Sequence, residues 1–400
     1  MDVRAIKDKS LPVRPIHLWL FITALLAYGI SGGIFGTTFN NFLSDVFNMN
    51  AMARGQLEFP RELPGFLCAA ISGALFFLTE LRAAGVAALL ISAGTFVLAL
   101  TEQSYLRLLI ALLLWSSGTH LLIPLTSAIG MQLAPPNRRA TLLGQLRAVN
   151  AIAMVIGCGI VWIAIDRWRF SYATLFVISA TAVLLVALIL FTMPPVATQT
   201  GPRPKFVYDR RYRLFYLLNI LFGARKQLFL TFGPWVLVRI FRQPASTFAR
   251  LWIIVAPISA LINPQIGRLV DSWGERRVLM LDGAILTLVC LGYAFAAHIP
   301  KMGLLIAFVC YMLDQLLFVT GIARATYLRK IAAREEDVTA SLSFGVSLDH
   351  IVSMSLPSLA GYVWMRYGYE YVFIVAAVLA ICTLFAASRI REDSKSHRQC

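Results

Sequence analysis

Charged residues interrupt long apolar stretches of this chain, and they are the residues best placed to do chemistry there. Arg225 and Lys226 stand side by side, about 20 Å along an apolar segment at the rise of an α-helix. Asp314 and Asp349 occupy similar depths in two later segments, and His350 follows Asp349. A charge at the centre of a bilayer costs at least about 2.5–3.5 kcal/mol, so each should face either a cavity or an oppositely charged partner.

Each of these residues has a functional and a structural interpretation. Arg225 or Lys226 can bind the anionic group of a small molecule, and Asp314 or Asp349 can carry a proton. His350 titrates near neutral pH and can share a proton with Asp349. The structural alternative is that the two cations form ion pairs with the two aspartates. The sequence leaves both interpretations open.

A second charged cluster, Glu58, Arg61 and Glu62, opens an apolar segment that contains Pro60 and Pro64. Glu58 and Glu62 are four residues apart and therefore share a helix face. Prolines in a membrane helix leave backbone carbonyls that water or a ligand can satisfy. We expect this cluster near the extracellular mouth, where it either couples proton movement to an outer gate or forms a solvated helix start.

Arg147 and His120 are further candidates for substrate binding. Arg147 lies about a third of the way into its apolar segment, where it can meet an anion in a cavity or extend its long side chain to the cytoplasmic surface. His120 lies near the middle of another segment, where a histidine either contacts substrate or is simply hydrogen-bonded within the protein.

The composition requires a membrane to position these residues. Hydrophobic residues make up 58% of the chain and charged residues 14%, against roughly 25% charged in soluble domains. The net charge of +16 could indicate nucleic-acid binding, but the basic residues fall in short loops and at the termini. That distribution is typical of membrane topology, so we expect an integral membrane protein that binds no nucleic acid.

Signatures of enzymes and cofactor sites are missing from the sequence. It has no P-loop and no metal-ligand spacing, so neither catalysis, ATP hydrolysis nor a cofactor is expected. Five of the six cysteines lie in apolar runs, Cys400 ends the tail, and no Cys-x-x-Cys pair occurs, which predicts buried, inert thiols. The first apolar stretch is too long for a signal peptide and is expected to remain as a first span.

About 20 apolar residues cross a bilayer core, and on that measure the chain has twelve candidate spans. They are 16–43, 57–80, 83–101, 106–133, 140–165, 171–193, 212–240, 246–272, 276–298, 301–331, 336–366 and 369–391. Residues 194–211 are Pro-rich and then basic, as in a linker. We therefore expect a bundle of six helices over 1–193, a cytoplasmic linker over 194–211, and a second six-helix bundle over 212–400.

The connection between the eighth and ninth predicted spans is short and highly charged. Gly267 is expected to end a helix where backbones approach, and Asp271 to offer its carboxylate to the N-terminus of another helix. With Arg268, Gly274 and Arg276, these residues would form a cytoplasmic gate. The segment resembles the G-x-L-x-D-x-x-G-x-R-R loop signature of the major facilitator superfamily of transporters.

This resemblance implies an all-α, multi-pass protein of twelve helices in two six-helix bundles that works by alternating access. A weaker copy of the signature, Gly73-Ala74-Leu75, follows the second predicted span, with Phe77 at the position of Asp271. Such internal repeats are typical of secondary transporters. We expect a monomer in the cell membrane, the inner membrane in a bacterium, with a small-molecule substrate and protons as partners.

The membrane-embedded cations favour proton-coupled transport of a small organic anion. A proton-driven exporter of hydrophobic or cationic drugs is an alternative, in which Asp314, Asp349, Glu58 and Glu62 would supply negative charge. A membrane sensor that transports nothing is a second alternative, although so many polar residues at depth argue against it.

Lys and Arg are concentrated in the termini, the linker and the loops on their side of the membrane, which predicts that both termini are cytoplasmic. A cysteine introduced near Lys205, or a tag after Cys400, should therefore be inaccessible to impermeant reagents applied to intact cells. Labelling from outside would show that the orientation is reversed.

Overall fold

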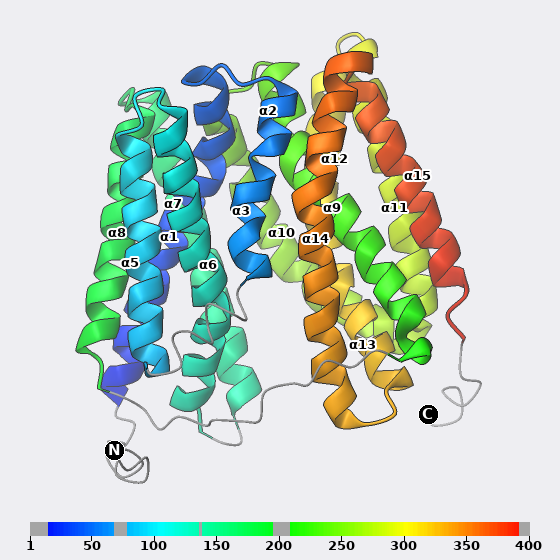
Figure 1. Cartoon of the computed structure of the whole chain (residues 1–400), viewed down its shortest axis with the longest axis horizontal. Helices are drawn as coiled ribbons and strands as arrows, with labels where there is room; N and C mark the ends of the chain where they lie inside the picture. The colour runs from blue at the N-terminus through cyan, green and yellow to red at the C-terminus, as the bar shows by residue number, and fades with distance from the viewer. Residues whose placement is uncertain (1–14, 68–77, 136–137, 195–208, 392–400) are drawn as a thin grey trace. The chain divides into compact units, whose positions relative to one another are not determined.

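The computed structural model describes residues 15–67, 78–135, 138–194 and 209–391, and every regular element in these ranges is a helix (Figure 1). The first half contains α1 (Pro15–Asp45), α2 (Ala51–Gln56), α3 (Glu58–Phe66), α5 (Glu80–Ala99), α6 (Tyr105–Leu133), α7 (Arg139–Asp166) and α8 (Tyr172–Thr192). The second half contains η2 (Arg210–Tyr212), α9 (Arg213–Arg239), α10 (Ala245–Trp273), α11 (Glu275–Phe295), η3 (Ala296–His298), α12 (Gly303–Leu317), η4 (Phe318–Thr320), α13 (Gly321–Ile331), α14 (Glu335–Tyr367) and α15 (Tyr369–Ser388).

The predicted multi-pass α-helical fold is confirmed, and the predicted spans coincide with these helices to within a few residues. Within the described residues, nine helices are long and apolar enough to cross a membrane. The second predicted span continues beyond α3 into residues that the structure does not describe. The span predicted over 301–331 corresponds to Gly303–Ile331, in which the 3₁₀ turn η4 lies between α12 and α13.

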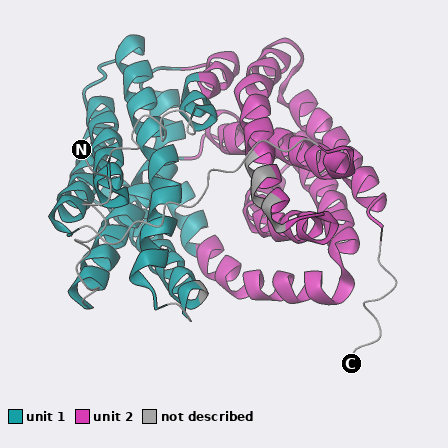
Figure 2. Ribbon diagram, turned by 60° about the horizontal axis from the view of Figure 1, so that its bottom comes forward, with its two compact units in different colours: residues 1–48, 60–202, 244–253 teal, residues 49–59, 203–243, 254–400 magenta. Residues whose placement is uncertain are grey.

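Contacts divide the chain into two compact units (Figure 2). Unit 1 comprises residues 1–48, 60–202 and 244–253, and unit 2 comprises residues 49–59, 203–243 and 254–400. Each unit thus includes a short segment from the opposite half of the chain. The predicted linker and Gly73-Ala74-Leu75 lie mostly or wholly outside the described residues, so the predicted bundle boundaries and the repeated loop stay predictions.

The same helix pairing occurs inside each unit. In unit 1, α1 packs against α7, and α5 packs against both α6 and α8. In unit 2, α9 packs against α14, and α11 packs against both α12 and α15. Counted as spans, the first pairs with the fifth and the third with the fourth and sixth in both halves. This common pattern supports an internal structural repeat.

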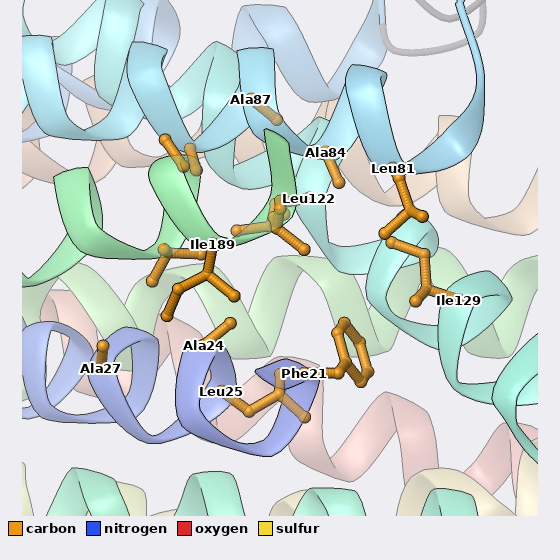
Figure 3. Close-up of a cluster of buried hydrophobic side chains, with 14 of the residues drawn as sticks. Phe21, Ala24, Leu25, Ala27, Leu81, Ala84, Ala87, Leu122, Ile129 and Ile189 are labelled. Carbon is orange, nitrogen blue, oxygen red and sulfur yellow. The ribbon is translucent and has the colours of Figure 1, made fainter. Parts of the chain in front are cut away.

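Unit 1 has an apolar core formed by α1, α5, α6 and α8 (Figure 3). Phe21, Leu25, Leu122 and Ile129 are almost completely buried there. Lipid tails are as apolar as these side chains, so helices in a membrane associate mainly through close packing rather than through the hydrophobic effect. The quality of the helix contacts therefore decides the stability of each unit.

Glycines on α1 show where that packing is closest. A Cβ atom at Gly33 would overlap the carbonyl oxygen of Met154 on α7, and one at Gly29 would lie 2.5 Å from the carbonyl oxygen of Asn150. By contrast, no described atom lies within 4 Å of a Cβ added at Gly32 or Gly36. These glycines form two faces of α1, and only the face with Gly29 and Gly33 is therefore a tight helix contact.

Helices α10 and α11 are joined by a single residue, Gly274, with φ of +84°. A positive φ is strained for residues with a side chain, so glycine is required at this turn. Gly267 does not end a helix as predicted, because α10 continues through it to Trp273. A Cβ at Gly267 would meet no atom of the described residues within 4 Å, so the expected close backbone approach is not seen among them.

Replacing Gly33 by Ala should destabilise the protein by about 1–3 kcal/mol, because the added methyl group overlaps the backbone of α7. The matched change Gly32→Ala should be neutral or slightly stabilising, since its methyl group meets open space and alanine favours the helix. Thermal unfolding of the purified variants in detergent measures the difference. Equal unfolding temperatures would contradict the assigned contact.

Candidate functional site

The two predicted cations of α9 form ion pairs with the two predicted aspartates, all inside unit 2. Arg225 donates from Nη2 to Oδ1 of Asp314 on α12 at 2.9 Å, and both side chains are 2% exposed. Lys226 pairs with Asp349 on α14, and these side chains are 18% and 17% exposed. The neighbouring cations therefore differ in accessibility, because successive residues of a helix point about 100° apart.

The Arg225 guanidinium is surrounded by aromatic rings. Its central carbon lies 5.2–5.9 Å from the ring centroids of Phe222, Phe229 and Phe318. Aromatic faces attract cations, so these rings partly replace the water that a buried guanidinium has lost. Nε and Nη1 of Arg225 are buried and have no hydrogen-bond partner among the described residues. Arg225 thus keeps donors free for a second acceptor.

Gly223 has no side chain, so Asp349 can lie directly against α9. A Cβ atom at Gly223 would overlap Oδ1 of Asp349. That oxygen is buried and has no hydrogen-bond partner among the described residues. His350, the next residue on α14, is also buried. The Asp349 carboxylate therefore packs between α9 and α14 and can still accept a hydrogen bond.

Two charged residues that the sequence analysis did not select lie beside these pairs. Asp282 on α11 is 4% exposed, and Arg324 on α13 is 7% exposed. Asp282 interacts electrostatically with both Arg225 and Arg324. The central guanidinium carbon of Arg324 lies only 3.5 Å from the centroid of Phe222. Their presence inside predicted spans 276–298 and 301–331 was the signal that could have identified them.

A 3₁₀ turn in the tenth span, η4, lies at this cluster. The hydroxyl of Thr320, the last residue of η4, is within 3.1 Å of Oδ1 of Asp282 and 2.8 Å of the carbonyl oxygen of Leu317. A stretch of 3₁₀ helix inside a longer helix often marks a functional hinge. The turn therefore marks the same region as the charges.

Together, these residues form a charge-balanced cluster within unit 2. Its cations are Arg225, Lys226 and Arg324, and its carboxylates are Asp282, Asp314 and Asp349. Burial penalises any charge without a counterion, so a balanced set is what an apolar interior can hold. We call these six residues the charge cluster.

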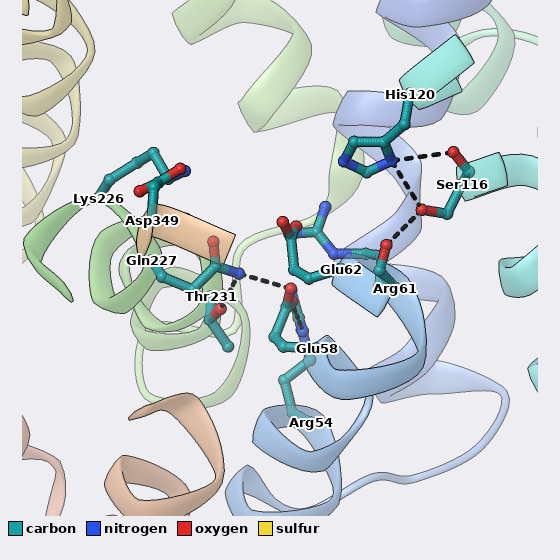
Figure 4. Close-up of polar contacts among 10 residues, drawn as sticks. All are labelled: Arg54, Glu58, Arg61, Glu62, Ser116, His120, Lys226, Gln227, Thr231 and Asp349. Atoms are coloured by element: carbon teal, nitrogen blue, oxygen red, sulfur yellow. Dashed lines mark hydrogen bonds and ion pairs between the residues drawn. The ribbon is translucent and has the colours of Figure 1, made fainter. Parts of the chain in front are cut away.

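Glu58 belongs to another buried network of unit 2 (Figure 4). It is fully buried, pairs with Arg54 of α2 and accepts a hydrogen bond from Nε2 of Gln227 at 2.6 Å. Gln227 neighbours Lys226 on α9 and also approaches Thr231 at 3.4 Å. The alternative of a solvated helix start therefore does not hold for Glu58.

In unit 1, Arg61 and Glu62 form an ion pair at 3.1 Å. The backbone oxygen of Arg61 accepts a hydrogen bond from Ser116, and Nδ1 of His120 lies 3.0 Å from the same hydroxyl (Figure 4). A ring nitrogen of His120 and a carboxylate oxygen of Glu62 lie within 4.8 Å of each other. His120 is thus hydrogen-bonded within its own helix and close to a buried acid.

Other predicted site residues are not members of the charge cluster. Arg147 is exposed on α7, in unit 1. In the predicted gate, Arg268 donates to Gln265 at 3.4 Å, and Asp271 is exposed near the end of α10. Arg276 lies in the first turn of α11. Substrate, coupling and gating roles for all these residues stay predictions.

Comparisons with known proteins agree with the sequence resemblance. The family model described as Major Facilitator Superfamily matches residues 62–347 and 258–399. No curated protein gives a significant match. Among solved structures, the nucleoside transporter NupG has a TM-score of 0.76 at 15% identity, covering 94% of this chain and 99% of its own.

Further structural matches extend over almost the whole chain. A bacterial homologue of the human lysosomal transporter Spinster, in an inward-facing and occupied conformation, has a TM-score of 0.71 at 16% identity, covering 96% of this chain and 98% of its own. A D-xylose–proton symporter has a TM-score of 0.65 at 15% identity, covering 95% and 98%. At these identities the similarity establishes the fold alone.

Gly223→Ala should displace the Asp349 carboxylate and destabilise the protein by about 1–3 kcal/mol through overpacking. Removing the carboxylate by Asp349→Ala should relieve this clash, so the double variant should cost at least about 1 kcal/mol less than the sum of the single changes. Unfolding in detergent measures this coupling. Gly267→Ala, whose methyl group meets open space, is the matched control, and additive effects would contradict the contact.

Proposed function

This chain belongs to the major facilitator superfamily of membrane transporters, and we propose that it moves a small organic anion together with protons by alternating access. Its membership makes it a multi-pass secondary transporter rather than an enzyme. Support for the anion and the proton comes from the charge cluster. The observation that carries the proposal is the Lys226–Asp349 ion pair, which is partly exposed beside the fully buried Arg225–Asp314 pair.

Lys226 is the residue of the cluster best placed to contact an anion. Its side chain retains access to solvent, whereas Arg225 and Arg324 are more deeply buried. An incoming anion must compete with Asp349 for the ammonium group. An unprotonated Asp349 close to a bound anion would also repel it, which disfavours binding in the charge-balanced state.

Proton binding to Asp349 removes this competition. The neutral carboxyl no longer pairs with Lys226, and the cluster gains one positive charge that the anion then neutralises. Proton and anion therefore favour each other's binding, which is the reciprocal linkage required for symport. Asp349 also retains an oxygen without a described partner, so it can hold the proton while remaining against Gly223.

The fold comparisons are compatible with such coupling, because one structural match is a proton symporter by name. The predicted roles of Arg147, His120, His350, Glu62 and the Asp271 loop fit the same transport cycle. We further propose a monomer with cytoplasmic termini in the cell membrane. A drug exporter that binds a cation at Asp349 is the competing function, and anion binding discriminates between the two.

The proposal predicts opposite effects for the two members of the exposed pair. Lys226→Gln should weaken anion binding at least tenfold, about 1.4 kcal/mol, because the attracting charge is lost. In the wild type, affinity should rise as pH falls, since Asp349 must be protonated. Asp349→Asn, which resembles the protonated acid, should bind at all pH values and should lose proton-driven accumulation while retaining exchange.

Thermal-shift binding of lactate, succinate and inorganic phosphate to the purified protein provides the measurement, with tetraphenylphosphonium as the cationic comparison. Glu370→Gln, which changes a partly exposed acid in the first turn of α15 and outside the cluster, is the matched control. Unchanged anion binding in Lys226→Gln would refute the assigned site. Specific binding of tetraphenylphosphonium that depends on Asp349 would replace the proposal with the exporter.

A further inference from the structure

The charge cluster contains one carboxylate that the proposed transport step does not use. Asp282 lies seven residues after Glu275, the first residue of α11, which is about 10 Å along the helix. Glu275 pairs with Lys330 at 2.8 Å, so the start of α11 and the end of α13 lie at the same end of unit 2. Asp282 is therefore closer to this end than Arg225, which lies midway along α9.

We propose that Asp282, Thr320 and Arg324 form a second proton-binding site, located at the 3₁₀ turn of the tenth span. The inference rests on the proposed proton coupling, but it concerns different residues from the anion site. It gives a function to η4 and to Asp282 and Arg324, the two buried charges that the proposed transport step does not use.

Thr320 makes this site suitable for holding a proton. Its hydroxyl has one hydrogen and two acceptors in reach, Oδ1 of Asp282 at 3.1 Å and the carbonyl oxygen of Leu317 at 2.8 Å. When Asp282 is ionised, Thr320 can donate to the carboxylate. When Asp282 is protonated, the new O–H can donate to Thr320, which then donates to Leu317. Both states keep their hydrogen bonds, and the proton enters and leaves without breaking a covalent bond.

The surrounding charges stabilise Asp282 in both its ionised and its protonated state. Asp282 is faced by Arg225 from α9, by Arg324 from α13 and by Asp314 from α12. Helix α15, which packs against α11, has no charged residue between Glu370 and Arg389. When Asp282 is ionised it balances Arg324, and when it is protonated Arg324 remains stabilised on the Phe222 ring and by electrostatic interaction with Asp349.

Protonation also changes the side-chain hydrogen bond that Thr320 makes within the 3₁₀ turn. Leu317 is the last residue of α12, and Thr320 ends η4. With Asp282 ionised, the threonine hydrogen is shared between the carboxylate and Leu317. With Asp282 protonated, the threonine hydroxyl donates to the carbonyl oxygen of Leu317 alone. The proton thus acts directly on the junction between α12 and α13, which lets proton binding bias the geometry of that junction.

Infrared difference spectra of the purified protein between alkaline and acidic pH test the site without any substrate, because the proton itself is the probe. The wild type should show a protonated-carboxyl C=O band that is missing in Asp282→Asn. Since that change leaves Arg324 without its counter-charge, Asp282→Asn/Arg324→Gln is the charge-balanced variant, and it should lack the band as well. Glu370→Gln should retain it.

The threonine variants separate a proton site from a purely structural ion pair. Thr320→Val removes the hydroxyl and should shift or abolish the Asp282 band, whereas Thr320→Ser keeps the hydroxyl and should preserve it. If the charge-balanced double variant has the wild-type spectrum, or if valine and serine behave alike, Asp282 is only a counterion and the inference is wrong. If the wild-type protein binds none of the tested anions, the proposed function is wrong. The infrared spectra would still test the proton site in that case.

Discussion

The Arg225–Asp314 ion pair is the interaction on which the interior of unit 2 depends. Each ion loses several kcal/mol of hydration in an apolar interior, and removal of one partner typically costs about 3–5 kcal/mol because the other charge remains buried. Arg225 is therefore tied to α12 at 2.9 Å and enclosed by aromatic rings. It also interacts electrostatically with a second carboxylate, Asp282 of α11. One buried cation is thus balanced by charges on two other helices.

The two halves use the same helix contact in chemically different ways. In unit 1, Gly29 of α1 lies against Asn150 of α7, which is a neutral contact. In unit 2, Gly223 of α9 lies against Asp349 of α14 at the equivalent pairing of first and fifth helices. Exchange of an amide for a carboxylate requires a nearby cation, and Lys226 supplies it. The two halves therefore share this helix pairing. Of these two contacts, only the one in unit 2 involves an ion pair.

Most of the fold could be predicted from the sequence, because span length and hydrophobicity are set by the bilayer rather than by tertiary contacts. Depth along a helix also identified Arg225, Lys226, Asp314 and Asp349. Which cation pairs with which acid depends on helix rotation, which hydropathy does not contain. Asp282 and Arg324 were missed because charges nearer span ends resemble residues that reach the interface. Gly267 was misread because a glycine within a helix costs only about 1 kcal/mol and need not end it.

A charge-balanced interior limits what such a protein can bind. Because every cation of the cluster has a counter-charge within unit 2, an ion that enters alone creates an imbalance whose electrostatic penalty grows as the local dielectric falls. An ion that enters with an opposite charge, or with a proton that neutralises a carboxylate, avoids this penalty. The same burial that makes the ion pairs necessary for folding therefore makes paired movement of charges the favourable mode of binding. Structural pairing and the proposed coupling would then be two consequences of one constraint, rather than competing roles for the same residues.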